Sequence, residues 1–257
     1  MKLNELQPYR IGEMVRVGDK EDGGYVIPSH FRGSRLTLIS IGLGDNWSFE
    51  NQGKGIFFDK FISVDHTVSI FSITSRFFKR VFSKKIKLSI SYYFFKLLIN
   101  YLKTFIFGRN THIRKKLVSA SKRERKNEIS LDECFSLTDG EKILLKIDIE
   151  GDEYKIVEDI SRYSEMIDLL IIEFHQTEKM QIEFSRSMLM LKELFLLVHS
   201  HGNNFDFISV NGMPNTIECT FVNRKTFNEK YEKIQNLPLI GIDFPCNPNK
   251  PDIGLIF

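Results

Sequence analysis

Acidic and imidazole side chains follow several apolar stretches of the sequence, and these residue types can remove a proton from an alcohol. Asp148 and Glu150 follow one stretch, Glu173 and His175 follow the next, and His201 comes later. Carboxylates and imidazoles act as general bases, and the same groups bind hard divalent cations. The pattern predicts a centre where a hydroxyl is deprotonated, either by a base or with the help of a divalent metal.

A pair of glycines and a distant acid form a second pattern. Gly42 and Gly44 follow an apolar stretch, where a missing Cβ lets the backbone approach a ligand. Asp65 ends the next apolar stretch, 21 residues after Gly44. In nucleotide-binding βαβ units, an acid at about this spacing accepts hydrogen bonds from ribose hydroxyls. Together these features predict a site for an adenosine-containing cofactor.

The residues next to these glycines favour a cationic cofactor over a dinucleotide. A pyrophosphate requires a third small residue, and Trp47 stands at that place in this sequence. Asp45 would repel a phosphate but attract a sulfonium or an ammonium group. S-adenosylmethionine therefore fits better than a nicotinamide dinucleotide. An NAD(P)-dependent sugar oxidoreductase is the alternative enzyme.

The elements that position these residues are strands alternating with helices. Short β-branched runs bounded by turns indicate strands covered on both faces, so we expect a doubly wound, mostly parallel, Rossmann-like α/β sheet. In such a sheet, ligands bind outside the carboxyl ends of the strands. The predicted strands are Leu36–Leu43, Phe61–Val64, Ile143–Ile149, Ile167–Ile172 and Thr216–Val222, the last paired with Phe205–Val210, and the predicted helices are Asp152–Met166 and Phe184–His199.

Several segments resemble the motifs of one known family. The most specific is Leu144–Tyr154, which is similar to the K-I-D-x-E-G-x-E segment of the FkbM-type family of S-adenosylmethionine-dependent O-methyltransferases. The other similar segments are D-G-G-Y-V at 22–26, I-G-L-G-D at 41–45, I-S-L-D at 129–132, H-x-N-N at 201–204, E-x-T at 218–220, D-F-P at 243–245 and N-P at 247–248. The resemblance spans nearly the whole chain apart from about residues 67–126, and it implies a class I methyltransferase fold.

The resemblance also implies roles for individual residues. Gly42, Gly44 and Asp45 would surround the methionine end of the cofactor, and Asp65 would bind its ribose. Asp148 would lie at the reaction centre. In full, the expected cofactor-binding residues are Gly42, Gly44, Asp45, Asn46, Trp47, Asp65 and His66, the catalytic residues are Asp148, Glu150, Glu173 and His201, and the substrate-binding residues are Tyr25, His175, Asn203 and Asn204.

Each of these residues also has a purely structural interpretation. Asp148 or Glu150 could cap the following helix, and Glu173 could be an ion-pair partner. A histidine such as His201 is more often packed or solvent-facing than catalytic. Trp47 could pack in the core as readily as at the rim of a cofactor.

Charge is unevenly distributed along the 257 residues. The net charge is +3, but residues 76–126 hold 16 Lys and Arg against one acid, which gives +15 here and −12 elsewhere. Aromatic residues interleave with the basic ones. We expect residues 67–126 to form a helical insertion that packs on the body or a second subunit, covers an anionic acceptor, or contacts an anionic membrane surface. Nucleic acid is not expected as a partner, because the acidic remainder would repel it.

Composition and cysteine spacing set the class of protein. With 42% hydrophobic and 27% charged residues, the chain can bury one large core, so we expect residues 1–257 to be a single methyltransferase domain. Cys134, Cys219 and Cys246 are too far apart for a disulfide framework or a structural zinc pattern, which favours the reducing cytoplasm. A signal-peptide pattern and a stretch apolar enough to span a membrane are both lacking.

These observations combine into one prediction of function. We expect a cytoplasmic, S-adenosylmethionine-dependent O-methyltransferase that acts on a sugar hydroxyl. Family members modify sugars or natural products, so the expected partner is a small molecule, a nucleotide sugar or polysaccharide precursor such as those of capsular polysaccharide synthesis. A homo-oligomer is also expected. A non-catalytic module that docks at membranes through residues 76–126 is the alternative outside enzymology.

Overall fold

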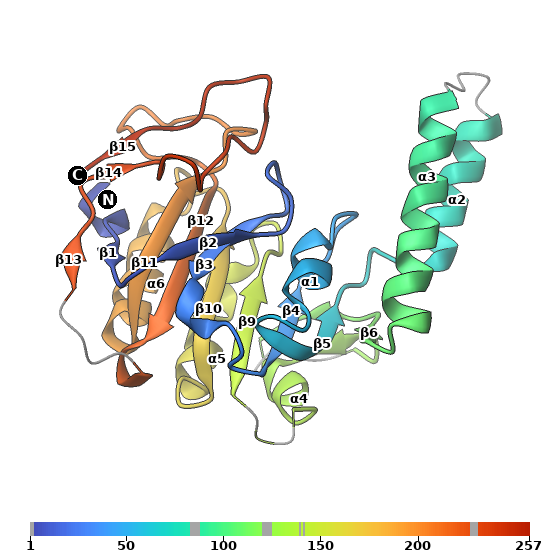
Figure 1. Cartoon of the computed structure of the whole chain (residues 1–257), viewed down its shortest axis with the longest axis horizontal. Coiled ribbons are helices and arrows are strands. Elements are labelled where there is room, and N and C mark those ends of the chain that lie inside the picture. The colour runs from blue at the N-terminus through green and yellow to red at the C-terminus, as the bar shows by residue number, and fades with distance from the viewer. Residues whose placement is uncertain (1–2, 83–87, 120–124, 139, 141, 227–230) are drawn as a thin grey trace.

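A seven-stranded central sheet organises the protein, with helices packed against both of its faces (Figure 1). The computed structural model describes residues 3–82, 88–119, 125–138, 140, 142–226 and 231–257. The strand order is β11-β12-β10-β9-β4-β5-β6. These strands are β4 (Leu36–Ile41), β5 (Phe58–Val64), β6 (Thr111–Ile113), β9 (Ile143–Ile147), β10 (Ile167–Phe174), β11 (Phe195–Gly202) and β12 (Ile217–Asn223).

All neighbouring strands in the sheet run parallel except β12, which is antiparallel to both β10 and β11. The strand order reverses between β4 and β9, so their carboxyl ends form the point where such sheets bind ligands. This order, with one antiparallel strand beside the edge, is that of the class I methyltransferase fold. The predicted fold class is confirmed.

Two apolar clusters cover the two faces of the sheet, because every second strand residue points to the same side. On one face the strands pack against α4 (Leu131–Phe135), α5 (Val157–Arg162) and α6 (Gln181–Leu194). On the other face they pack against α1 (Ser48–Gly53) and the hairpin of β2 (Met14–Val17) and β3 (Tyr25–Pro28). Burial on both faces explains why the strands read as continuous apolar runs.

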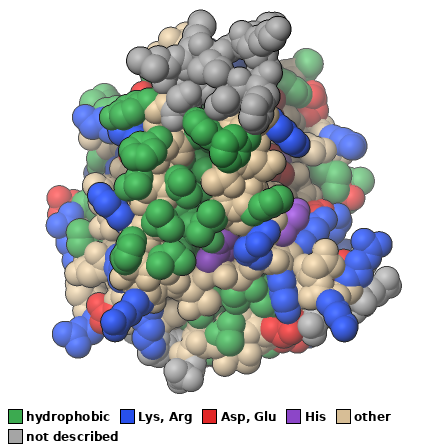
Figure 2. Space-filling model, turned by 90° about the vertical axis from the view of Figure 1, so that its right-hand side faces the viewer, with side chains coloured by type: hydrophobic (Ala, Val, Ile, Leu, Met, Phe, Trp, Pro, Cys, Tyr) green, Lys and Arg blue, Asp and Glu red, His purple; other side chains and the backbone are tan. Residues whose placement is uncertain are grey.

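The insertion after the second strand is a helical hairpin, as predicted, but it is shorter than residues 67–126, because Thr111–Ile113 form β6 of the central sheet and Lys116–Leu117 form β7. It consists of α2 (Ile70–Phe82), α3 (Leu88–Tyr101) and the π-helical η3 (Leu102–Phe107), and Figure 1 shows it beyond the edge of the sheet. Residues 83–87 and 120–124 of the predicted insertion lie outside the described residues. Figure 2 shows hydrophobic side chains beside Lys and Arg on this side of the molecule. The exposed ones on the insertion include Phe71, Phe78, Tyr92, Tyr93, Phe95, Ile106 and Phe107.

Three sequence predictions of local structure are wrong. Helix α6 ends at Leu194, and the residues from Phe195 form strand β11 rather than its last turns. An unbroken apolar run fits both periods, so sequence could not separate the helix from the strand. β11 is also the partner of β12, whereas residues 205–210 form a loop with one isolated bridge at Ile208. The helix predicted over 152–166 is shortened to η5 (Glu153–Lys155) and α5.

Short elements tie the two ends of the chain together. Strand β1 (Tyr9–Arg10) pairs with β13 (Glu232–Lys233), and β14 (Asn236–Leu237) pairs with β15 (Leu255–Ile256). Between β14 and β15, residues 238–254 form a C-terminal strap without helix or strand. The remaining elements are η1 (Leu3–Leu6), η2 (Ser29–Phe31), β7 (Lys116–Leu117), β8 (Glu128–Ile129) and η6 (Arg224–Thr226). Within the described ranges, no helix is both long and apolar enough to cross a membrane.

Candidate active site

The side chain of Asp65 is hydrogen-bonded to the backbone of the turn that follows β4. One carboxylate oxygen accepts hydrogen bonds from the backbone N–H groups of Leu43 and Gly44, at 2.8 and 3.0 Å. The other oxygen accepts from the backbone and the hydroxyl of Thr67, both at 2.6 Å. Burial alone would raise the pKa of Asp65, but these hydrogen bonds outweigh it and lower the pKa below its ordinary value. The ionised carboxylate of Asp65 therefore fixes the backbone of the glycine turn in place.

A cavity of about 360 Å³ lies beside this turn, and we call it the glycine-side cavity. It brings together four of the predicted cofactor-binding residues with two of the predicted catalytic ones. Its lining consists of Ile41, Gly42, Gly44, Val64, Asp65, His66, Thr67, Lys115, Lys116, Leu117, Asp148, Ile149, Glu150 and Asp152.

A second cavity of about 360 Å³, the acidic cavity, lies over the carboxyl ends of β9 and β10. Five of its nine lining residues are acids, and its only basic side chain is that of His175. The lining consists of Asp22, Asp148, Glu150, Glu173, His175, Asn203, Phe205, Asp206 and Thr216. The two cavities share Asp148 and Glu150, so a molecule in one can meet a molecule in the other at these two residues.

His175 is the charged centre of the acidic cavity. Its Nδ1 donates to the buried carboxylate of Glu153 at 2.8 Å, and its Nε2 lies 3.7 to 4.0 Å from oxygens of Asp148, Glu150 and Glu173. Burial alone would lower the pKa of His175, but the hydrogen bond to Glu153 and the surrounding carboxylates raise it to about 9. The imidazole is therefore protonated near neutral pH and offsets part of the acidic charge.

Asp148 lies at the junction of the two cavities and is held from two sides. Its Oδ2 accepts from the hydroxyl of Tyr25 at 3.3 Å, and its Oδ1 faces His175. Burial raises the pKa of Asp148, although the nearby charges of Lys146 and His175 oppose the shift. A carboxylate with a raised pKa holds a proton more readily than an ordinary one, as a general base requires.

Glu173 and Asn203 form the wall of the acidic cavity opposite the glycine turn. The side-chain amide of Asn203 donates to Glu173 at 2.9 Å. Burial, with the charges of Asp148 and Glu218, raises the pKa of Glu173 well above its ordinary value. Glu173 is therefore the acid in this cavity that is most readily protonated.

The two shared residues and His175 can also bind a cation. Asp148, Glu150 and His175 each offer one ligand atom, and these atoms lie within 4.8 Å of one another. Two carboxylates and an imidazole suit a hard divalent ion such as Mg²⁺ or Mn²⁺. In that case the ion would replace the proton on Nε2 of His175.

Three residues predicted to bind the cofactor lie outside the linings of both cavities. Both carboxylate oxygens of Asp45 accept from the guanidinium of Arg76 on α2, at 2.6 and 2.7 Å. Asn46 binds the backbone of Asp22 instead. Trp47 is fully buried and donates from its indole N–H to Thr104 at 3.1 Å. The side chains of Asp45 and Trp47 thus connect the glycine turn to the insertion. Sequence spacing could not reveal these contacts.

Two further predicted residues contact the C-terminal strap instead of a cavity. His201 lies at the carboxyl end of β11, on the predicted rim, but it is 1% exposed and faces Glu218 and Asp252. The amide of Asn204 donates to backbone carbonyls of the strap and accepts from the N–H of Asn247. Tyr25 is likewise absent from the cavity linings and reaches the site only through its contact with Asp148.

Sequence reasoning missed several residues that shape the site. Asp22 and Asp206 line the acidic cavity, Glu153 holds His175, and Lys146 is buried 3.2 Å from the carbonyl of Gly42. A signal existed for two of them, since Asp22 begins the noted D-G-G-Y-V segment and Lys146 belongs to the most specific motif. Asp206 was hidden because its loop was assigned to a strand.

Comparisons with known proteins match the fold but not the sequence. Searches against protein families and curated proteins find no match. A chain of a fibrillarin/Nop5p complex matches at 12% identity and a TM-score of 0.36, over 74% of this chain and 73% of that chain. The 23S rRNA methyltransferase ErmE matches at 8% identity and 0.37, over 76% and 66%. A dimethyladenosine transferase from Plasmodium falciparum matches at 11% and 0.37, over 74% and 56%.

The prediction about partners is corrected by these matches. A nucleotide sugar was expected and nucleic acid was excluded, yet ErmE is described as an rRNA methyltransferase. The exclusion of nucleic acid is therefore withdrawn. The acidic cavity gives a physical reason against the nucleotide sugar as well, because five carboxylates would repel a pyrophosphate.

Proposed function

We propose that this protein is an S-adenosylmethionine-dependent O-methyltransferase that acts on a sugar hydroxyl. The observation that carries the proposal is the junction of two cavities at Asp148 and Glu150. One cavity has the glycine turn and acid of an adenosine site, and the other has the acids and imidazole needed to deprotonate an alcohol. A methyl donor and its acceptor would meet at the shared residues, as a group transfer requires.

The glycine-side cavity offers suitable groups for each part of the cofactor. Gly44 has open space where a side chain would be, so backbone there can contact the methionine end. Asp65 is ionised and lines this cavity, and we assign it to the ribose hydroxyls because of its spacing from the glycines. Leu117 and Val64 supply apolar surface for the adenine. The FkbM-type resemblance of Leu144–Tyr154 supports the same assignment.

The proposed reaction is an in-line displacement at the methyl carbon of the sulfonium. The acceptor oxygen forms the new bond to carbon, the bond from carbon to sulfur breaks, and the sulfur keeps that electron pair as a neutral thioether. The hydroxyl proton passes to the carboxylate of Asp148. The imidazolium of His175 and the hydroxyl of Tyr25 hold this carboxylate in position.

The charge of the acidic cavity constrains the acceptor. Its five carboxylates outnumber the single imidazolium, so a neutral or a positively charged sugar would be favoured over one that carries phosphate. Hydroxyls of a sugar ring can donate hydrogen bonds to these carboxylates.

The three cysteines are all unpaired, which supports a reducing compartment such as the cytoplasm.

Two measurements test the function. Isothermal titration should show binding of S-adenosylmethionine, and no binding at high micromolar concentration would overturn the proposal, whereas NADH binding would favour the oxidoreductase. Labelled methyl donor is then incubated with neutral sugars, amino sugars and an RNA oligonucleotide, and mass spectrometry locates the label. Label on a hydroxyl oxygen of a sugar is expected, and label on a nucleobase would overturn the O-methyltransferase assignment.

A third measurement separates the base from the metal. The protein is dialysed against EDTA, and activity is measured before and after Mg²⁺ is added back. With Asp148 as base, activity survives dialysis. Loss that only Mg²⁺ restores would assign deprotonation to an ion held by Asp148, Glu150 and His175.

A further inference from the structure

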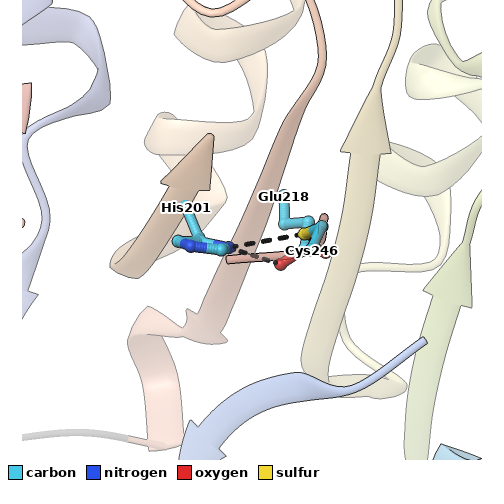
Figure 3. A group of neighbouring side chains, drawn as sticks. All are labelled: His201, Glu218 and Cys246. Atoms are coloured by element: carbon cyan, nitrogen blue, oxygen red, sulfur yellow. Dashed lines mark hydrogen bonds and ion pairs between the residues drawn. The ribbon is translucent and has the colours of Figure 1, made fainter. Parts of the chain in front are cut away.

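A buried group of three potential metal ligands lies outside both cavities. It consists of His201 at the end of β11, Glu218 on the neighbouring strand β12, and Cys246 in the C-terminal strap (Figure 3). All three side chains are buried, at 1%, 4% and 1% exposure. Figure 3 shows that they point toward one another from three separate segments.

The distances within this group suit a tetrahedral metal ion. Nδ1 of His201 lies 3.2 Å from Oε2 of Glu218, Sγ of Cys246 lies 4.0 Å from Nδ1, and it lies 3.7 Å from Oε1 of Glu218. Ligand atoms at ordinary Zn–N, Zn–O and Zn–S bond lengths stand about 3.4–3.6 Å apart in a tetrahedron. Shifts of a few tenths of an ångström would therefore bring all three into the first coordination shell.

The outer ring nitrogen of His201 is already oriented by a carboxylate. Nε2 of His201 lies 3.0 Å from Oδ1 of Asp252, and its N–H donates a hydrogen bond to this carboxylate. Metal-binding histidines usually donate their second ring N–H to such a carboxylate, which fixes the tautomer and directs the free lone pair at the ion. The group thus has the second layer of contacts that a metal site needs, in addition to the three ligands.

The surrounding charge is a separate indication that a cation belongs here. Glu218 is paired in register with Glu173 across β12 and β10, and both side chains are buried. The imidazole of His201 therefore contacts two carboxylates, those of Glu218 and Asp252, and a third buried acid, Glu173, is the strand partner of Glu218. A divalent ion would neutralise the carboxylate and a thiolate together.

We propose that His201, Glu218 and Cys246 bind one Zn²⁺ ion, which fastens the C-terminal strap to strands β11 and β12. The thiol of Cys246 loses its proton to solvent when the ion binds, and imidazole Nδ1 binds in its neutral form. A thiolate selects Zn²⁺ over hard ions such as Mg²⁺. A bidentate Glu218 or a water molecule completes the four ligands.

Sequence spacing concealed this site. The ligands are separated by 17 and 28 residues, and they do not form the short pairs that mark zinc-binding motifs. The fold brings them together because β11 and β12 are adjacent and the strap crosses their ends. The proposal does not depend on methyltransferase activity.

The zinc content of the purified protein tests the proposal directly. Full-length protein is produced with added Zn²⁺, desalted, and analysed by inductively coupled plasma mass spectrometry. One zinc per chain is expected, and Cys246→Ser and His201→Gln should each lower the affinity at least about tenfold in competition with a chromophoric chelator. Cys134→Ser, at another buried cysteine, is the matched control and should retain zinc. Unchanged zinc affinity in a folded Cys246→Ser variant would overturn the proposal.

Cobalt substitution tests the wild-type protein without relying on any variant. Co²⁺ bound by a thiolate gives a sulfur-to-metal charge-transfer band in the near ultraviolet, which carboxylate and imidazole ligands alone do not give. The band is expected in the wild type, in Cys134→Ser and in His175→Gln, which removes a ligand from the other cluster. Wild-type protein that shows no such band and contains no zinc would refute the site.

Discussion

A Cβ atom on Gly42 would lie 1.5 Å from the backbone carbonyl oxygen of Asp148. The turn after β4 and the turn after β9 therefore touch directly, and only a residue without a side chain permits this. Gly44, two residues later, has no atom within 4 Å of its own Cβ position. Both glycines have positive φ, at +79° and +58°, so they differ in contact rather than in backbone region.

This difference predicts unequal effects of two alanine substitutions. Gly42→Ala and Gly44→Ala should each lose about 1–2 kcal/mol of unfolding free energy, because alanine is strained in the left-handed region. Gly42→Ala should lose about 1–3 kcal/mol more, because the Asp148 backbone must move. Urea unfolding followed by circular dichroism measures both losses. Equal losses of unfolding free energy in the two variants would show that moving the turn after β9 away from Gly42 costs no stability.

Asp65 should stabilise the fold in a pH-dependent manner. Hydrogen bonds lower its pKa despite burial, so its contribution is complete above its ordinary pKa of 3.8 and is lost as the pH falls through the folded value. Asp65→Asn should cost about 2 kcal/mol at neutral pH and much less near pH 2. Urea unfolding at both pH values measures the cost. Asp59→Asn, in an exposed pair with Arg35 at 3.9 Å, is the control and should cost little at either pH.

Asp148→Asn should impair turnover far more than cofactor binding. The amide cannot accept the hydroxyl proton, so kcat should fall by about 10²–10⁴-fold, whereas Kd for S-adenosylmethionine should change only a few-fold. Steady-state kinetics and calorimetry separate the two effects. The matched control is Asp152→Asn, since Asp152 also lines the glycine-side cavity but is paired with Lys116. Turnover within twofold of wild type in Asp148→Asn would remove Asp148 from its role.

His175 should stabilise the folded state most at low pH. Its pKa is raised from 6.5 to about 9, so its contribution is complete below pH 6.5 and is lost as the pH rises through about 9. The shift corresponds to about 3 kcal/mol. The loss of stability in His175→Gln should therefore be larger at pH 6 than at pH 9.5, as measured by urea unfolding. A loss that does not vary with pH would contradict the raised pKa.

The sequence predicted the parts of the site that lie on single, strongly patterned segments. The glycine turn, Asp65 and the acids after β9 and β10 could be found because buried parallel strands end abruptly in turn residues. Their meeting at one rim followed from the parallel sheet alone. Hence Gly44, Asp65 and Asp148 were expected together and lie around one cavity.

What the sequence could not predict depends on contacts between distant segments. Asp45 was expected near the cofactor, but Arg76 from the insertion takes both of its oxygens. His201 was expected to be catalytic, but the strap covers it through Asp252 and Cys246. Charge and spacing identify residues able to do chemistry, whereas the partner of each one is set by packing.

The single tryptophan of the chain lies where the insertion meets the body. Trp47 is fully buried, with the edges or faces of Tyr101 and Phe105 about 6 Å away between ring centres. Its emission spectrum is therefore an intrinsic optical probe of this junction. A red shift that precedes the loss of ellipticity during denaturation would report the hairpin detaching from an otherwise folded body, and no dye or label would be required.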